Sequence, residues 1–301
     1  MSFTMLDPVA IRAKCHRFRA LILGRANAGK TTVLKKVCNS TEDPEIHSPN
    51  GTKIELETVE GSASVLRGIH DIENQLIFKS HPGYIFHDSR GFESGSKEEA
   101  DKVIEFIDSR GRGKRLAEQL HVIWYCMPTE TTRPLLAAEE DFFFKSDVCG
   151  KVVVIFTKWD GLLTEALTAV IDESGDDDPS DEAVVQRADE MLEKNFMKKL
   201  GKADPGPAAY VRLKGDMREP MTDCNELIEE TVNALSDDAL QMLLVSVQQN
   251  NLDLSIKYAI LDAMSQTQIE GINNQSFPTM WVLMIQQISY RMHWDISRMS
   301  G

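Results

Sequence analysis

A glycine-rich loop between an apolar stretch and a helix-forming stretch constrains this chain more than its other features. The apolar run Phe18–Leu23 has the length of a strand, and the pattern G-x-x-x-x-G-K-T follows over residues 24–31. Because glycine carries no Cβ, Gly24 and Gly29 allow successive backbone N–H groups to point inward at one anion. The dipole of a helix that begins near Lys30 adds to this attraction. A strand, such a loop and a helix in this order predict a phosphate-binding loop.

The side chains of this loop suit a nucleotide that is bound with Mg²⁺. Lys30 is expected to place its ammonium group against the β- and γ-phosphates and to support catalysis there. The Thr31 hydroxyl is expected to ligate Mg²⁺, a hard cation that prefers oxygen. The residues expected to contact the nucleotide in this segment are Gly24, Arg25, Ala26, Asn27, Ala28, Gly29, Lys30, Thr31 and Thr32.

Apolar runs of strand length recur along the chain and alternate with segments long enough for helices. The expected strands are Phe18–Leu23, Gln75–Phe78, Tyr84–Phe86, His121–Cys126, Val152–Phe156 and Ala208–Leu213. The expected helices are Lys30–Cys38, Lys97–Ser109, Pro134–Phe144, Asp181–Leu200 and Asp223–Leu235. This alternation predicts an α/β fold with a mainly parallel sheet that is buried on both faces. The acidic run Asp172–Glu182 is expected to form an exposed loop, because its like charges repel one another.

Two more motifs follow apolar runs of the expected sheet. The run that begins at Tyr84 reads Y-I-F-H-D-S-R-G, which places Asp88 at the carboxyl edge of the sheet and Gly91 three residues later. The run that begins at Val152 reads V-V-V-I-F-T-K-W-D and ends on Asp160. Each of these motifs is common by itself. Together with the glycine-rich loop, three elements in this order on three strand ends are hard to obtain by accident.

These motifs together resemble those of Ras-like G domains, particularly the Era and TrmE type and the septin or AIG1-like type. The run F-R-A-L-I-L-G-R-A-N-A-G-K-T-T-V-L is also similar to fungal G-domain proteins. The resemblance covers about residues 17–235 and implies a P-loop three-layer sandwich that binds GTP or GDP with Mg²⁺ and hydrolyses GTP. Residues 236–301 lie outside the shared motifs, and their helix-like patterns predict a C-terminal helical extension.

The resemblance implies that Asp88 holds Mg²⁺ through water and that the Gly91 N–H senses the γ-phosphate. A hydroxyl from the segment 40–68 is expected to contact Mg²⁺ only when GTP is bound. Spacing to Asp88 favours Ser64 as this metal ligand. The other hydroxyls of the segment that qualify chemically are those of Thr52, Thr58 and Ser62.

The resemblance also implies that the T-K-x-D motif recognises guanine. Asp160 would accept hydrogen bonds from the ring N–H and the exocyclic amine of guanine, a pair of donors that adenine lacks. Lys158 would pack its stem on the base. Thr157 stands where asparagine is usual, which is expected to loosen the bracing of the loop. A fourth element that contacts guanine is expected after the last strand, at Leu213 and Lys214.

Hydrolysis is expected to be slow. Ras-type enzymes orient the attacking water with a glutamine directly after the D-x-x-G motif, whereas Phe92 stands there and cannot form a hydrogen bond through its side chain. Acceleration would then come from a partner, from self-association or from a cation. Asn27 resembles an asparagine that helps to ligate K⁺ beside the phosphates in some GTPases, and the alternative is that it fits a turn position. The catalytic candidates are thus Lys30, Gly91 and Asn27.

Composition and charge restrict the partners and the location. The net charge of −14 argues against nucleic acid, because a polyanion would be repelled. The five cysteines never form a C-x-x-C pair, so reduced thiols are expected rather than zinc or disulfides. No apolar run has the length of a signal peptide or a transmembrane helix, and a cytoplasmic location is expected. The expected partners are a guanine nucleotide and an unidentified protein effector or regulator, with a homodimer left open.

Three functions remain open at this point. The favoured one is a switch that hydrolyses GTP, and the alternatives are a nucleotide-binding scaffold with negligible turnover and an ATP-using P-loop enzyme. Asp160 at the end of its apolar run favours guanine over adenine. Near the C-terminus, Trp281, Ile285, Ile288 and Met292 form one apolar stripe, which is expected to pack on the helices of the same domain. A dimer interface and a membrane-surface helix are the alternatives for that stripe.

Overall fold

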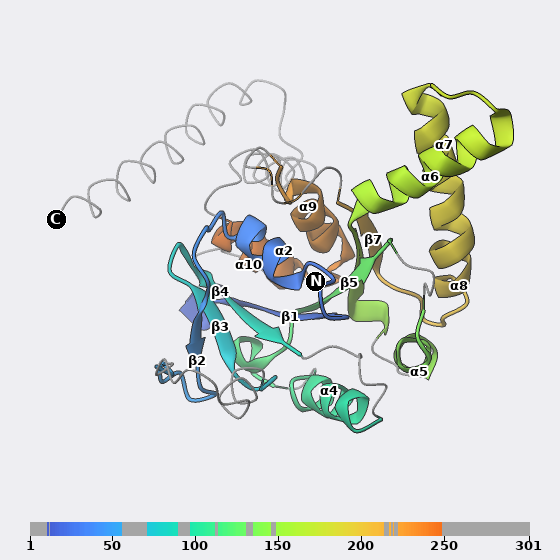
Figure 1. The fold of residues 1–301 in the computed structure, drawn as a ribbon. Coiled ribbons are helices and arrows are strands. Elements are labelled where there is room, and N and C mark those ends of the chain that lie inside the picture. Colours follow the sequence, from blue (N-terminus) through green and yellow to red (C-terminus); the bar gives the residue numbers. More distant parts are fainter. Residues whose placement is uncertain are drawn as a thin grey trace, which may run out of the picture. The chain divides into compact units, whose positions relative to one another are not determined.

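The computed structural model describes residues 11, 13–55, 71–89, 97–111, 114–130, 135–145, 149–213, 217, 219 and 222–248. Within these residues the chain forms a seven-stranded sheet in the order β2-β3-β4-β1-β5-β6-β7, with helices beside it (Figure 1). The fold is therefore α/β, as the alternation of apolar runs and helix-forming segments predicts.

Most neighbouring strands of the sheet run in parallel. The strands are β1 (Phe18–Gly24), β2 (Glu45–His47), β3 (Gln75–Phe78), β4 (His81–Asp88), β5 (Val122–Pro128), β6 (Val152–Thr157) and β7 (Ala209–Arg212). β1 pairs in parallel with β4 and β5, and the parallel pairing continues through β6 to β7. β2 and β3 form an antiparallel edge, because β3 is antiparallel to both of its neighbours.

The helices lie mainly between successive parallel strands. Their bounds are α2 (Lys30–Val37), α4 (Lys97–Ser109), α5 (Ala137–Lys145), α6 (Trp159–Ser174), α7 (Asp181–Leu192), α8 (Lys198–Leu200), α9 (Asn225–Ala234) and α10 (Asp238–Val247). Two short 3₁₀ segments are η1 (Leu116–Glu118) and η2 (Cys149–Lys151), and a π-helical segment, η3 (Glu193–Met197), joins α7 to α8. The helix expected over Asp181–Leu200 is thereby confirmed as one continuous helical stretch.

Helices cover both faces of the sheet. Leu21 and Leu23 of β1 belong to a large apolar cluster that includes Phe106 of α4 and Phe142 of α5. Successive side chains of a strand point to opposite faces, so the alternate residues of β1 face the other helices. On that second face α10 packs against β1 and β4, and α9 packs against β6 and β7. Figure 1 shows α2, α9 and α10 on one side of the sheet and α4 on the other, and all residues of β1 are buried between these layers.

β2 and α6 are not among the elements that the sequence predicts. β2 has three residues, of which only Ile46 is buried, and so short a run gives no periodic signal. α6 does carry a signal, since Leu162 and Ala166 are buried one helical turn apart, but this segment lies between the T-K-x-D motif and the acidic run. The expectation of a loop throughout Asp172–Glu182 is wrong, because both of its ends are helical. Its exposure is confirmed along nearly all of its length.

The sheet-bearing unit extends further along the chain than the shared motifs do. The chain divides into two compact units after Leu252, whereas the helical extension predicted from the sequence begins at residue 236. The reason lies in α10, which packs on the sheet closely enough that a Cβ on Gly83 would lie 2.9 Å from the Cβ of Val247. The second unit, with the stripe from Trp281 to Met292, lies outside the described residues.

The strand order brings several loops to one edge of the sheet. From β1 the chain moves to β2, β3 and β4 on one side, and from β4 it crosses over to β5, β6 and β7 on the other. In open α/β sheets ligands bind outside the carboxyl ends of the strands, where the direction of the chain reverses in this way. The glycine-rich loop follows β1, the central strand at this point.

Candidate nucleotide site

The glycine-rich loop joins the carboxyl end of β1 to the first turn of α2. Gly24, Asn27 and Gly29 have φ angles of 134°, 59° and 84°. At Gly24 a Cβ would overlap the backbone carbonyl oxygen of Cys126 on β5, so a larger residue would displace one of these strands. Asparagine tolerates a positive φ better than most residues, and this accounts for Asn27 by backbone conformation alone. Its expected role in binding K⁺ stays a prediction.

Lys30 folds back over this loop. Its Nζ atom donates to the carbonyl oxygens of Gly24 at 2.9 Å and of Arg25 at 3.0 Å. The first turn of α2 contains no acidic residue, so the N-terminal end of the helix dipole and the ammonium group attract an anion together. Of the other loop residues, Ala26, Asn27 and Thr31 are exposed, Thr32 is half-buried and Ala28 is buried.

The T-K-x-D motif is hydrogen-bonded to the glycine-rich loop. The buried Thr157 hydroxyl donates to the carbonyl oxygen of Ala28 at 2.9 Å, across a separation of 129 residues. A Cβ on Gly29 would lie 3.8 Å from Thr157 Cβ, so the two loops are close to van der Waals contact. Threonine in place of the usual asparagine therefore still braces the loop, through its hydroxyl group. The expected loosening is absent at this contact.

Asp88 ends β4 beside the glycine-rich loop. The parallel pairing of β4 with β1 places it next to Ile22. Its Oδ1 atom is buried and has no hydrogen-bond partner among the residues that the structure describes. Burial raises the pKa of this carboxyl to about 6, and the positive charge of Lys30 opposes that rise. A buried carboxylate oxygen left without a partner beside the glycine-rich loop fits an outer ligand of a hydrated Mg²⁺ ion.

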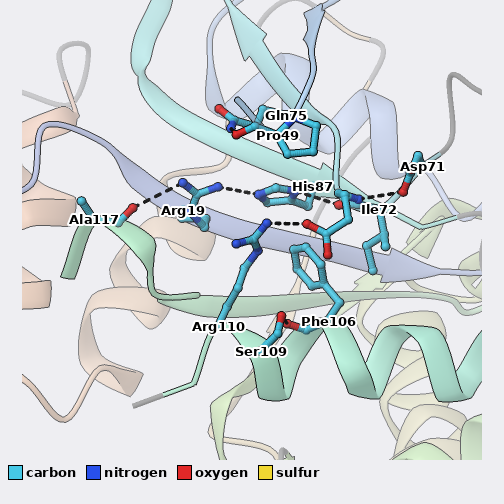
Figure 2. A network of polar contacts seen from close by, with 11 residues as sticks. Arg19, Pro49, Asp71, Ile72, Gln75, His87, Phe106, Ser109, Arg110 and Ala117 are labelled. Carbon is cyan, nitrogen blue, oxygen red and sulfur yellow. Dashed lines mark hydrogen bonds and ion pairs between the residues drawn. The ribbon is translucent and has the colours of Figure 1, made fainter. Parts of the chain in front are cut away.

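A buried polar network holds His87, the residue of β4 that directly precedes Asp88 (Figure 2). Arg19 Nη1 donates to His87 Nε2 at 2.7 Å, and His87 Nδ1 donates to the Ile72 carbonyl oxygen at 2.8 Å. Burial and the nearby Arg19 charge lower the pKa of His87 to about 3, so the ring is neutral and can accept the first of these bonds. Arg19 also donates to the Ala117 carbonyl oxygen at 3.3 Å. The bond between Arg19 and His87 thus connects β1 to β4 through side chains, in addition to the backbone pairing of the two strands.

Replacing Asp88 with asparagine is expected to stabilise the nucleotide-free protein while weakening its Mg²⁺-dependent nucleotide binding. The folded pKa of about 6 exceeds the ordinary value of 3.8, so ionisation destabilises the folded state as pH rises from about 4 to above 6. This cost is absent below about pH 4. At pH 7 the substitution should raise the free energy of unfolding by about 1 to 2 kcal/mol, less than the full shift because an amide is polar too.

Denaturant unfolding at pH 7, without nucleotide, measures this change. Asp108→Asn, on the exposed side of α4, is the matched control and should leave both stability and binding unchanged. A nucleotide-free Asp88→Asn protein that is less stable than the parent would contradict the assignment of Asp88 as an unsatisfied buried carboxylate.

The loop that carries Asp160 is braced by Thr129, the residue that directly follows β5. The Thr129 hydroxyl shares its proton between the carbonyl oxygens of Thr157 at 3.1 Å and Lys158 at 3.0 Å. Lys158 has a φ of 58° at the start of α6, and its ammonium group pairs with Glu130. Asp160 lies in the first turn of α6 with its side chain exposed. Its carboxylate is therefore accessible to a base while the backbone beneath it is fixed.

A stacked pair of side chains supports the same loop from β7. Trp159, directly before Asp160, is buried, and the Arg212 guanidinium lies over its ring at 4.5 Å from the centroid. Arg212 in turn pairs with Asp189 of α7. Leu213 follows Arg212 directly, is buried, and donates its backbone N–H to a carbonyl of β6 at 3.1 Å. Leu213 thus lies at the edge of the sheet where Asp160 lies.

Several expected site residues cannot be placed. Gly91, Ser64 and Lys214 lie outside the described residues, as do Phe92, Thr58 and Ser62. Within the described part of the chain no group of three or more His, Cys, Asp or Glu side chains is arranged to hold a metal ion. Mg²⁺ in this site would therefore depend on phosphate and water oxygens as well as on Thr31 and Asp88. That ligand set is usual for Mg²⁺ in phosphate sites.

The sequence of this chain can be compared with protein-family models and with curated protein sequences. No protein-family model matches it, and no curated protein sequence matches it. None of the helices that the structure describes is both long enough and apolar enough to span a membrane. A function can therefore be proposed only from the residues and their geometry.

The buried carboxylate of Glu139 is not among the site residues that the sequence predicts. Arg25 of the glycine-rich loop forms an ion pair with Glu139, which lies 114 residues further along the chain. No motif or spacing connects these two positions. The available signal was weak: a glutamate among apolar residues of α5, in a helix whose buried side includes Phe142 and Phe143.

Proposed function

We propose that this chain is a GTP-binding protein with a Ras-like G domain, which hydrolyses GTP slowly and acts as a nucleotide-dependent switch. The observation that carries the proposal is the hydrogen bond from Thr157 to Ala28. It joins the T-K-x-D loop to the glycine-rich loop, so that a base at Asp160 and a phosphate at Lys30 belong to one ligand. Asp88 lies on the other side of β1, where a metal ion beside the phosphates is expected.

Each part of the nucleotide has protein groups suited to it. The N–H groups of residues 24–32 and the Lys30 ammonium suit the phosphates, and the exposed Asp160 carboxylate suits the two donors of guanine. Mg²⁺, held by the Thr31 hydroxyl and through water by Asp88, would neutralise charge on the phosphate oxygens. Asp88 Oδ1 is buried and has no hydrogen-bond partner among the described residues, so it can accept a bond from water at little further cost of desolvation.

Slow turnover follows from the residue after the D-x-x-G motif. Phe92 offers no group to orient an attacking water, so the chain depends on a backbone group, a partner or a cation for that step. Gly91, Lys30 and Asn27 remain the catalytic candidates, with Asn27 as the residue that would contact K⁺. The switch behaviour would come from the segment that contains Ser64 and from Gly91, if their contacts depend on the γ-phosphate.

Two other functions compete with this proposal. A scaffold that binds nucleotide without turnover has the same site, and the side chain of Phe92 is the feature that favours it. An ATP-using enzyme would need no carboxylate at Asp160, and the bracing of that loop by Thr129 and by the Arg212–Trp159 stack argues against it.

Binding and turnover of the full-length protein decide among the three. We expect micromolar or tighter binding of GDP and GTP that depends on Mg²⁺, weak binding of ADP, and slow phosphate release from GTP. Calorimetry with each nucleotide and a phosphate-release assay measure these properties. Preference for ADP would support the ATP-using enzyme, and tight GTP binding without phosphate release would support the scaffold.

A further inference from the structure

The side chain of Arg25, inside the glycine-rich loop, is held by a buried carboxylate. Arg25 Nε donates to Glu139 Oε1 at 2.9 Å, and Arg25 Nη2 donates to Glu139 Oε2 at 2.5 Å. The side chain of Glu139 is 0% exposed and that of Arg25 is 12% exposed. Two parallel bonds of this kind fix the plane of the guanidinium group as well as its position.

Glu139 is itself fixed by two further donors. The Tyr125 hydroxyl of β5 donates to Oε1 at 2.9 Å, and the Leu136 N–H donates to Oε2 at 2.8 Å. Burial and the negative charge of Glu139 raise the pKa of Tyr125 well above its usual value, so the phenol keeps its proton. Each carboxylate oxygen therefore accepts two hydrogen bonds, which is the condition under which a buried charge is tolerated.

The backbone of Arg25 reaches the phosphate-binding lysine. Its carbonyl oxygen accepts a hydrogen bond from Lys30 Nζ at 3.0 Å and one from the Ala28 N–H at 3.2 Å. Arg25 therefore binds Glu139 through its side chain and Lys30 through its carbonyl oxygen. A displacement of Arg25 would move both the lysine and the turn of the loop.

We propose that Glu139 is a positioning residue for phosphate binding. Through its two hydrogen bonds to Arg25, Glu139 of α5 keeps the glycine-rich loop in one conformation. In that conformation Lys30 and the backbone N–H groups face a β-phosphate. The inference rests on the proposed function in that a nucleotide must bind at this loop. A pair that only stabilised the fold would affect every ligand of the protein equally, whereas a positioning role affects ligands that carry phosphate.

The variant Arg25→Met/Glu139→Gln tests this role without leaving a charge unpaired in the core. The glutamine retains an oxygen for the Tyr125 hydroxyl, and the parallel bonds from the guanidinium are lost. The matched control is Arg187→Met/Glu173→Gln, which removes an Arg–Glu pair between α6 and α7. Circular dichroism and thermal unfolding show that each full-length variant is folded.

Affinities for Mg²⁺-GDP and for guanosine, which has no phosphate, are compared by calorimetry and NMR titration. We expect the test variant to bind GDP about tenfold or more weakly, as is common when a residue that orients a ligand-binding group is lost, and to bind guanosine as the parent does. The control variant should match the parent with both ligands. GDP affinity within about twofold of the parent, or an equal loss for guanosine, would overturn the proposal.

A preference of the parent protein for ADP separates this inference from the proposed function. Should the parent prefer ADP, the same comparison is made with ADP and adenosine, and the role of Glu139 is tested although the guanine assignment has failed.

Should the double variant not fold, Arg25→Lys is the second test variant. Lysine keeps the positive charge but cannot form the two parallel hydrogen bonds of a guanidinium group, so GDP affinity should fall by a smaller factor while guanosine binding stays unchanged. Unaltered GDP affinity in that folded variant would also overturn the proposal.

Discussion

Replacing Lys30 with alanine is expected to lower the affinity for Mg²⁺-GDP by about a hundredfold or more. A hydrogen bond to a charged group contributes about 1.5 to 3 kcal/mol, and every 1.4 kcal/mol changes a dissociation constant tenfold. Lys30 also donates to the carbonyl oxygens of Gly24 and Arg25, so its removal leaves the loop backbone without two bonds as well as the phosphates without their cation. Calorimetric titration of the nucleotide-free variant measures the loss.

Lys35→Ala provides the control on the same helix. The Lys35 ammonium pairs with Asp43 at 2.8 Å and donates to the Thr41 carbonyl oxygen, so it belongs to the surface of α2 and not to the loop. Its removal should leave GDP affinity unchanged. If Lys30→Ala bound GDP as tightly as the parent does, the phosphate site would have to lie elsewhere and the assignment of the glycine-rich loop would fail.

The sequence predicts β1, β5 and β6 because each is a fully buried apolar run with a clear end. Phe18–Leu23 and Val152–Phe156 are the best examples, since helices cover both faces of the sheet and every residue in these strands is buried. The same physics explains why β2 escaped prediction. An edge strand with one buried residue, Ile46, differs too little from a loop in composition.

Motif spacing predicts which loops carry the site but not which side chains hold them in place. The bonds from Thr157 to Ala28, from Arg25 to Glu139 and from Arg19 to His87 join residues 129, 114 and 68 positions apart. Such pairs depend on how the strands stack and which way each side chain points, and a single sequence contains no periodic trace of them. From the sequence, Thr157 is expected to belong to the motif that contacts guanine and departs from the usual asparagine, whereas its hydroxyl bond to Ala28 of the glycine-rich loop leaves no sequence signal.

Replacing Asp160 with asparagine is expected to change the preferred base from guanine to xanthine. In the proposed complex the carboxylate would accept hydrogen bonds from the ring N–H and the amine of guanine, whereas an amide presents a donor that suits the 2-oxo group of xanthine. The loop beneath it is held by Thr129 and by the stack of Arg212 on Trp159, so the new side chain should occupy the same place. The ratio of GDP to XDP affinity should fall by about a hundredfold or more, because unpaired polar groups discriminate strongly in such sites.

Competition between GDP and XDP for the purified protein measures this ratio, with Asp172→Asn as the control. Asp172 lies on the same helix, α6, and is exposed far along it from the first turn, so the control should keep the preference of the parent for GDP. Neither substitution alters the glycine-rich loop, so each variant should still require Mg²⁺ and Lys30 for binding. A retained preference for GDP in Asp160→Asn would mean that another group recognises the base, and Asp160 would then be an acidic residue that stabilises the first turn of α6 through the helix dipole.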